Sequence, residues 1–183
     1  RREVGAAGLH GEEGYTTLER KWARPTLDVN GIFGGYSGEG AKTIIPAWAG
    51  VKITMRLVPD QRPDTIRRLF RDYVKRIAPP YVTVSFVDHS GGGPVRIPRD
   101  APFMNEAVRA LEYGFGREPV FIREGGSIPV VLTLEKKLGL KTLLLGFGLP
   151  DDNAHAPDEK FSLADYERGI MTSARFLQLS ANH

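Results

Sequence analysis

The chain has 183 residues, of which 41% are hydrophobic and 26% charged, and its formal net charge is +3 at pH 7. This composition is that of an ordinary globular chain, neither disordered nor membrane-like, and no run approaches the ~18 apolar residues that span a membrane. The sequence contains no cysteine, which excludes disulfide scaffolds, thiolate metal sites and cysteine nucleophiles and is compatible with a reducing compartment. We expect a cytoplasmic location.

Charge is divided unevenly along the chain. Residues 1–99 hold 16 Lys and Arg against 10 Asp and Glu, whereas residues 100–183 hold 9 against 12. This contrast predicts two parts with different roles. The basic part either attracts anionic partners or is a solvated surface. The chain begins at Arg1 rather than at a methionine, so we expect a processed or truncated product.

The first part is predicted to be a small antiparallel sheet covered by a helix. Apolar and polar residues alternate from Val51 to Leu57, which is typical of a half-buried strand. Pro63 opens a helix, and Pro79 ends it. Its single apolar stripe consists of Ile66, Leu69, Phe70, Tyr73, Val74 and Ile77. Three further segments have strand character: Thr26–Phe33, Thr43–Ile45 and Val82–Phe86.

The second part, after the glycine-rich segment 91–94, is predicted to alternate helices and strands as an α/β layer. Asp100 is expected to cap a helix with Pro102 in its first turn, and Ser127 to start another. The apolar run Thr142–Leu145 is typical of a strand buried on both faces. A last helix begins at Ser162, and its expected core-facing residues are Leu163, Tyr166, Ile170, Ala174 and Leu177.

The segment Arg123–Pro129 is a candidate anion site. Gly125 and Gly126 allow a tight turn before Ser127, which stands at a helix start. Backbone N–H groups and a hydroxyl in that position suit a substrate carboxylate. The alternative is that Ser127 only caps its own helix. The spacing does not match a Gly-x-Ser-x-Gly nucleophile elbow, which argues against serine hydrolysis.

A second candidate site is the acidic segment Asp151–Glu159. It follows an apolar strand, which is where α/β proteins often place ligands. His155 within it is a candidate ligand for a divalent metal, and the alternative is an ordinary surface histidine. None of the other histidines stands at a metal-binding spacing from it: they are His10, His89 and His183.

Charged residues of the first part offer weaker candidates. Arg56, on the polar side of its strand, either grips a carboxylate or developing oxyanion or is simply exposed on the sheet. Glu12 and Glu13 have the form of a catalytic acidic pair, but no strand end or ligand histidine is near them, and we interpret them as surface residues. The helix after Pro63 has a basic face without an aromatic RNA-binding signature, and we interpret it as solvated: Arg67, Arg68, Arg71, Lys75 and Arg76.

Four blocks of the sequence together resemble one protein family. They are Gly38–Pro46, Met55–Asp60, Arg123–Pro129 and Asn153–Lys160. Their order and spacing are similar to those of the M20 family of di-zinc metallopeptidases, and most similar to its branch of cytosolic non-specific dipeptidases and carnosinases. The similarity runs from about Trp22 to the C-terminus.

The resemblance implies a fold of mixed α+β and α/β class. Residues 1–99 would be the later part of an antiparallel-sheet lid, or dimerisation, domain. Residues 100–183 would be the C-terminal part of an α/β zinc-peptidase catalytic domain. Because the family's lid also forms its dimer, the resemblance implies a homodimer.

The resemblance also implies roles for individual residues. His155 matches a zinc ligand, and Gly126 with Ser127 matches the residues that receive the substrate's free carboxylate. Thr43, Arg56 and His89 match lid residues that contact the substrate. In the hydrolysis that the family performs, Arg56 would stabilise the tetrahedral oxyanion.

The family has further metal-site residues that this chain lacks. They comprise a His-x-Asp pair, a bridging Asp, a Glu-Glu pair that supplies general base and ligand, and another Asp, and a lid histidine that reaches across the dimer is also upstream. A catalytic zinc needs about three protein ligands, so His155 alone is not enough. We therefore expect the C-terminal part of a di-zinc hydrolase of dipeptides or related amides with a free C-terminal carboxylate, inactive alone. The expected ions are two Zn²⁺ per complete site, with Mn²⁺ or Co²⁺ as alternatives.

Two other functions remain as alternatives. A lid that dimerises could serve as a non-catalytic interaction module. The basic helix face could bind nucleic acid through phosphate contacts, which we do not expect, and we expect no membrane partner. The expected partners are therefore a small peptide or N-acyl amino acid and a second copy of the chain.

Overall fold

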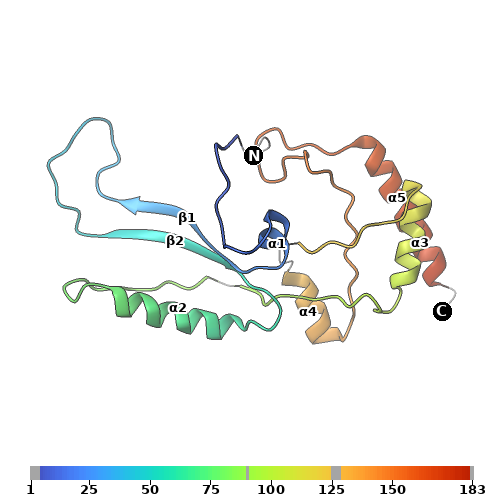
Figure 1. The fold of residues 1–183 in the computed structure, drawn as a ribbon, viewed down its shortest axis with the longest axis horizontal. Helices are drawn as coiled ribbons and strands as arrows, with labels where there is room; N and C mark the ends of the chain where they lie inside the picture. The colour runs from blue at the N-terminus through green and yellow to red at the C-terminus, as the bar shows by residue number, and fades with distance from the viewer. Residues whose placement is uncertain (1–4, 90, 125–128, 182–183) are drawn as a thin grey trace. The chain divides into compact units, whose positions relative to one another are not determined.

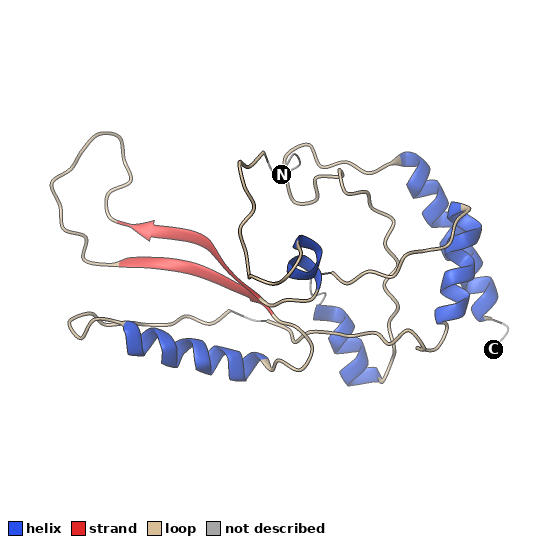
Figure 2. Cartoon of the chain, viewed as in Figure 1, coloured by secondary structure: helices blue, strands red, loops and turns tan. Residues whose placement is uncertain are grey.

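The structure, a computed structural model, describes residues 5–89, 91–124 and 129–181. It divides into two compact units. The first comprises residues 1–95 and 122–132, and the second comprises residues 96–121 and 133–183. The described residues form helices α1 to α5 and strands β1 and β2, which Figure 2 distinguishes by colour.

Strands β1 (Thr26–Gly34) and β2 (Ala49–Arg56) form an antiparallel hairpin in the first unit (Figure 1), and they confirm two of the predicted strands. A bulge between Val29 and Gly31 inserts one extra residue, so Val29 and Ile32 share a face although they are three residues apart. That face consists of three cross-strand apolar pairs: Leu27 with Met55, Val29 with Ile53, and Ile32 with Val51.

Two other predicted strands of this unit are wrong. Thr43–Ile45 lies in the loop between β1 and β2, where Ile45 is 96% exposed and the Ile44 N–H donates to the Lys42 carbonyl at 3.0 Å. Val82–Phe86 forms no ladder, because β1 and β2 pair with each other and no third strand exists within the described ranges. Alternation marks a segment that can form a strand, but a neighbour must supply the backbone partners.

Helix α2 (Pro63–Ile77) has the predicted boundaries, with Pro63 in its first turn and a C-cap at Ala78, next to Pro79. Its apolar stripe is only half covered. Phe70 packs edge-on against Phe86, with ring centroids 6.4 Å apart. The other side of the stripe is exposed: Leu69, Tyr73 and Ile77.

Helix α1 (Thr17–Trp22) was not expected from the sequence, and a capping box explains why so short a segment is helical. The Glu19 N–H donates to Thr16 Oγ1 at 3.3 Å, and the Thr16 N–H donates to the Glu19 carboxylate at 2.7 Å. The reciprocal bonds satisfy backbone donors that a helix start otherwise leaves unpaired. The Thr-x-x-Glu spacing was the sequence signal for this helix.

In the second unit, α3 (Met104–Phe115) packs against α5 (Leu163–Ser180), as Figure 1 shows. A Cβ added to Gly114 would lie 2.1 Å from Thr172 Oγ1 and 2.8 Å from the Arg168 carbonyl oxygen. The missing side chain at Gly114 therefore permits the close approach of the two helices. The buried residues of the pair are Ala107, Ala110, Asp165, Gly169 and Thr172.

The start of α3 differs from its prediction. The helix begins at Met104, and Asp100 does not cap it. The residue before Pro102 is disfavoured in helical conformation, which delays the helix. Phe103 occupies the N-cap position instead, with a left-handed φ of 62° and no side-chain cap bond.

Helix α5 confirms its predicted cap but not its predicted core face. The Ser162 hydroxyl accepts a hydrogen bond from the Asp165 N–H at 3.2 Å. The helix turns its small residues toward α3, because only small side chains fit at the Gly114 crossing. The apolar residues that we expected to face the core, most of them large, are exposed: Leu163, Tyr166, Ile170, Ala174 and Leu177.

Helix α4 (Pro129–Leu138) confirms the helix predicted in this segment, whereas its predicted start at Ser127, with Gly126, lies outside the described residues. Thr142–Leu145 does not form the predicted strand, since the described part of the chain offers it no neighbouring strand. No helix in the described ranges has the length and apolar character needed to cross a membrane.

Candidate functional site

His155 lies in a loop of the second unit that is closed by hydrogen bonds between its own residues. We call residues 149–160 the histidine loop. Its internal bonds run from the Asp152 N–H to the Leu149 carbonyl (3.2 Å), from the Ala156 N–H to the Asn153 carbonyl (2.8 Å), and from the His155 N–H to Glu159 Oε2 (3.4 Å). The first two are turn-type bonds between residues three apart. The sequence of the loop therefore determines much of its shape.

Three non-glycine residues of the histidine loop have left-handed backbone. Their φ values are 53° for Asn153, 66° for His155 and 60° for Asp158. Side chains with a Cβ disfavour this region, and Asn, Asp and His are among the residues that tolerate it best. Three such residues within six positions indicate a loop held in one conformation by its surroundings.

Asp152 is the buried residue of the histidine loop, with 8% of its surface exposed. Its Oδ2 accepts a hydrogen bond from the Leu149 N–H at 2.7 Å, and its carbonyl accepts one from the Lys160 N–H at 2.9 Å. Its Oδ1 is buried and has no hydrogen-bond partner within the described residues. A Cβ at Gly148 would stand 3.2 Å from Oδ2, so glycine gives this carboxylate its space.

Asp151, beside it, is exposed and already engaged. Its Oδ2 lies 2.5 Å from Lys160 Nζ. The hydrogen bond from Lys160 lowers the pKa of Asp151, and the same bond raises the pKa of Lys160. Because both groups are exposed, this pair contributes little to the free energy of folding. The ion pair with Lys160 nevertheless engages the carboxylate of Asp151, which is close to His155 in the sequence.

The His155 side chain is available as a metal ligand. It is exposed, and its ring nitrogens bond to none of the described residues. The described ranges contain no group of three His, Cys, Asp or Glu side chains arranged to hold a metal ion. One imidazole therefore fits one position of a metal site, and the chain supplies no complete site within those ranges.

The first unit holds Thr43 and Arg56 at opposite ends of its hairpin. Thr43 lies in the loop that joins β1 to β2, and Figure 1 shows this loop extending beyond the strands. Arg56 is the last residue of β2, opposite Thr26. The eight residues of β2 place its ends about 23 Å apart at ~3.3 Å per residue. The hairpin therefore keeps these two predicted substrate contacts apart within one chain.

His89 is exposed in the segment that follows α2. Its neighbour Asp88 accepts a hydrogen bond from Arg71 Nη2 at 2.5 Å and lies 3.8 Å from Arg67 Nε. These ion pairs hold the His89 segment against α2. Gly126 and Ser127, the expected carboxylate contacts, lie outside the described residues.

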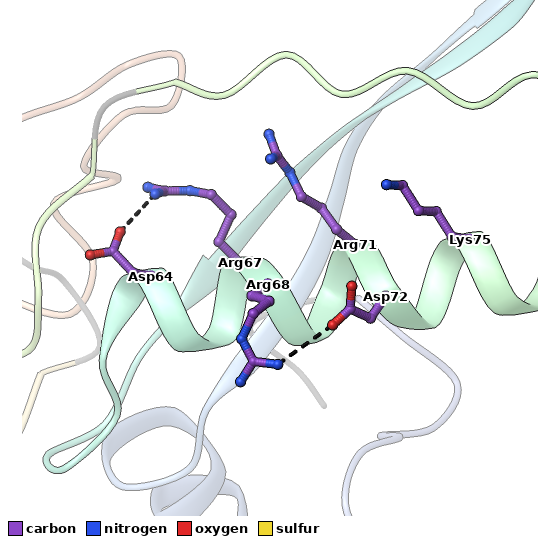
Figure 3. Close-up of a pocket in the computed structure, with 6 residues that line it drawn as sticks. All are labelled: Asp64, Arg67, Arg68, Arg71, Asp72 and Lys75. Atoms are coloured by element: carbon purple, nitrogen blue, oxygen red, sulfur yellow. Dashed lines mark hydrogen bonds and ion pairs between the residues drawn. The ribbon is translucent and has the colours of Figure 1, made fainter.

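The charged face of α2 forms a shallow groove of about 290 Å³, shown in Figure 3. Arg67 pairs with Asp64 at 2.8 Å, and Arg68 Nη1 lies 3.5 Å from an Asp72 carboxylate oxygen. Acidic neighbours thus offset part of the positive charge. None of the predicted site residues lines the groove, whose lining is Asp64, Arg67, Arg68, Arg71, Asp72 and Lys75.

Glu12 has a structural partner, which agrees with its interpretation as a surface residue. Arg24 Nε and Nη2 donate to its two carboxylate oxygens at 2.8 Å and 2.7 Å. The Arg24 guanidinium also lies over the Tyr15 ring, 4.3 Å from its centroid. The hydrogen bond from Arg24 lowers the pKa of Glu12.

Sequence reasoning missed one residue of the candidate site. Asp152 was recognised only as part of an acidic run, whereas the structure buries it as the closure of the histidine loop. The signal was its place three residues after Leu149 in the turn-forming sequence Leu-Pro-Asp-Asp, where an Asp side chain can accept a backbone N–H and close a turn.

The chain thus combines an antiparallel hairpin unit with a helix-pair unit that carries an ordered histidine loop, a combination typical of a two-domain α+β protein. Residues 6–82 match the peptidase dimerisation domain of the M20 family. The chain is 39% identical over 158 residues to the Cys-Gly metallodipeptidase dug1 of Schizosaccharomyces pombe, covering 84% of this chain and 33% of that protein.

Two further comparisons point the same way. The Beta-Ala-His dipeptidase of Homo sapiens is 30% identical over 172 residues, which cover 91% of this chain and 34% of that protein. The crystal structure of the M20 family metallo-carboxypeptidase Sso-CP2 from Sulfolobus solfataricus superposes with a TM-score of 0.82 at 29% identity, covering 97% of this chain and 40% of that one. The chain belongs to the M20 peptidase family. It spans about a third of the length of the curated relatives that it matches.

Proposed function

We propose that this chain acts as part of a metallopeptidase that hydrolyses dipeptides or related amides with a free C-terminal carboxylate. The observation that carries this proposal is the 39% identity, over 84% of the chain, with a relative named a Cys-Gly metallodipeptidase. A second relative is named a Beta-Ala-His dipeptidase. The absence of cysteine from the chain supports a cytoplasmic location for the enzyme.

In this proposal His155 is one ligand of a two-metal centre, with Zn²⁺ as the expected ion and Mn²⁺ or Co²⁺ as alternatives. An exposed imidazole on a loop that is already ordered suits this role. When bound, the ions supply Lewis-acid polarisation of a carbonyl and a water of lowered pKa. The remaining ligands and the general base come from polypeptide outside these residues, so the chain alone is expected to be inactive.

The other predicted residues bind and orient the substrate. Gly126 and Ser127, just before α4, receive the terminal carboxylate through a hydroxyl and backbone N–H groups. Arg56 donates to the oxygen that gains charge in the tetrahedral transition state, a role typically worth ~3 kcal/mol. Thr43 and His89 contact the substrate from the lid, which comprises residues 1–99, and residues 100–183 belong to the catalytic domain.

The enzyme works as a homodimer in this proposal, and the hairpin geometry supports that assembly. A dipeptide is about 7 Å long, whereas the ends of β2 are about 23 Å apart. One copy of the chain therefore cannot bring both Arg56 and Thr43 to the same substrate with its hairpin in this form. Two copies related by a two-fold axis can, with Arg56 from one and Thr43 from the other.

Replacement of His155 in the complete protein tests the metal role. His155→Ala is expected to lower the amount of bound metal per protomer, because one of about three ligands of an ion is lost. The rate of dipeptide hydrolysis is expected to fall by at least ~100-fold. His10→Ala, which removes an exposed histidine outside the site, is the matched control and should change neither quantity. Undiminished metal content and turnover in His155→Ala would refute the proposal.

Mixing two inactive variants tests the two-copy site. Arg56→Ala and Thr43→Val are each expected to be inactive as pure dimers. Unfolded and refolded together, they should recover about a quarter of the wild-type rate, since half of the mixed dimers are heterodimers with one intact site of two. No recovery, despite heterodimers demonstrated by mass spectrometry, would place both residues in the same subunit's site.

A non-catalytic interaction module is the second candidate function. It is favoured by the match of residues 6–82 to a dimerisation domain and by the exposed side of the α2 stripe. Two measurements distinguish the interaction module from the peptidase: light scattering on the 183-residue chain, and a hydrolysis assay of the complete protein. A stable dimer in the first, with no metal-dependent hydrolysis in the second, would support the module. A monomer would count against it.

A further inference from the structure

We infer that Asp152 is the positioning residue for His155: it closes the histidine loop and so fixes the direction from which the imidazole meets the metal. This inference rests on the proposed metal-binding role of His155. Asp152 stands three residues before His155 in the chain, and it need not touch the ion. Groups that hold a ligand in place affect metal affinity nearly as strongly as some ligands do.

The hydrogen bonds of Asp152 reach both ends of the loop. Its Oδ2 holds the Leu149 N–H at 2.7 Å, where the loop begins, and its carbonyl holds the Lys160 N–H at 2.9 Å, where the loop ends. The residue also donates its own N–H to the Leu149 carbonyl at 3.2 Å. Asp152 therefore joins the two ends, and His155 lies between them. Asp151 also links the two ends, because its Oδ2 lies 2.5 Å from Lys160 Nζ, but that pair is exposed and contributes little to stability. The other hydrogen bonds within the loop, among the described residues, connect residues three or four apart.

The backbone of the loop needs such a closure. Asn153, His155 and Asp158 all have positive φ, a conformation that costs residues with a Cβ roughly 1–2 kcal/mol each. Strained residues persist only where the surrounding contacts fix them. Without the Asp152 bonds the loop could relax to ordinary φ values, and the His155 side chain would then leave from the backbone in a different direction.

Only one carboxylate oxygen of Asp152 is used in the closure. Oδ1 is buried without a partner in the described ranges, and Oδ2 carries the bond to Leu149. A buried polar atom without a partner lowers stability, so the charge itself is not needed to hold the loop. An asparagine amide oxygen can accept the same N–H bond. The conservative variant Asp152→Asn thus separates the closure from the charge.

The test measures Zn²⁺ affinity of the complete protein by competition with a chromogenic chelator, together with urea unfolding. Asp152→Ala is expected to weaken Zn²⁺ binding 10- to 100-fold, whereas Asp152→Asn should stay within about 3-fold of wild type, since it keeps the Leu149 bond. Amide hydrogen exchange in the metal-free protein should be faster at Leu149 only in the alanine variant, because the Leu149 N–H bonds to the Asp152 side chain whereas the Lys160 N–H bonds to its backbone carbonyl.

Gly114→Ala is the matched control, because it perturbs the α3–α5 crossing in the same unit without touching the loop. Weakened Zn²⁺ binding in Gly114→Ala equal to that in Asp152→Ala would overturn the inference, because general destabilisation would then explain both. Equal losses in Asp152→Asn and Asp152→Ala would also overturn it, because the charge rather than the closure would matter.

Gly148→Ala provides a second route if Asp152→Ala does not fold. The added Cβ would stand 3.2 Å from Asp152 Oδ2 and displace the carboxylate slightly, so a smaller loss of Zn²⁺ affinity is expected. Unchanged affinity in this variant would count against the inference. If the wild-type protein binds no divalent metal, both the inference and the proposed function fail. If Zn²⁺ affinity falls in His155→Ala but not in Asp152→Ala, the inference alone is refuted.

Discussion

The helix pair of the second unit and the hairpin of the first are stabilised in different ways. At the α3–α5 crossing, Gly114 and Thr172 are packed so closely that no added atom fits between them. The hairpin presents its apolar face largely uncovered, with Ile32 81% exposed. The helix pair is therefore a tightly packed core, whereas the exposed apolar face of the hairpin is typical of a surface that another layer of structure covers.

The largest expected effect is at the closed crossing. Gly114→Ala would place a Cβ against Thr172 and the Arg168 backbone, which cannot move aside as a flexible side chain can. We expect a loss of about 2–3 kcal/mol in the free energy of unfolding, measured by urea denaturation. Gly146→Ala, in the same unit and with open space around its Cβ, is the control and should lose less than ~0.5 kcal/mol. Equal losses in the two variants would show that the crossing is looser than described.

A smaller effect is expected on the hairpin face. Ile32→Ala removes methyl groups that are already mostly in water, so the 183-residue chain should lose less than ~0.5 kcal/mol. In the complete protein the same substitution should cost more, because the covering layer would bury this face. Unfolding of both forms measures the difference, and equal losses would mean that the face stays open.

The smallest effect concerns a surface ion pair that joins two segments of the first unit. Arg24 lowers the pKa of Glu12. The pair therefore contributes stability above the unfolded-state pKa of the glutamate, and this contribution is lost as the pH falls through the lower folded-state pKa. Titration of the Glu12 carboxyl by NMR should show the lowered pKa, and Arg24→Gln should return it to the ordinary range. A Glu12 pKa that does not respond to Arg24→Gln would contradict the pairing.

The same contrast explains what the sequence could predict. Features decided by neighbours in the chain were predictable: the strand alternation from Val51, the Pro63 helix start and the Ser162 cap all appear in the structure. Features decided by distant partners were not. Val82–Phe86 has a strand pattern without a strand to pair with. The core face of α5 could not be predicted, because the glycine at 114 that selects small residues is some fifty positions away.

The candidate site follows the same rule. His155 and its acidic neighbours were recognisable from a local pattern, and the chain keeps them in an ordered loop. The role of Asp152 required coordinates, because burial distinguishes it from Asp151, which has the same side chain and lies one residue away. The separation of Thr43 from Arg56 along the hairpin required the pairing of the two strands, which local residue patterns do not give.

The left-handed backbone of the histidine loop also constrains how these positions can evolve. Glycine adopts such φ values without the steric cost that a Cβ brings. At Asn153 and Asp158, natural variation toward glycine should be easily tolerated. At His155 the backbone favours glycine, whereas the proposed role as a metal ligand favours imidazole. Lineages that abandon metal dependence should therefore replace His155 with glycine early, and lineages that keep it should retain histidine against that conformational preference.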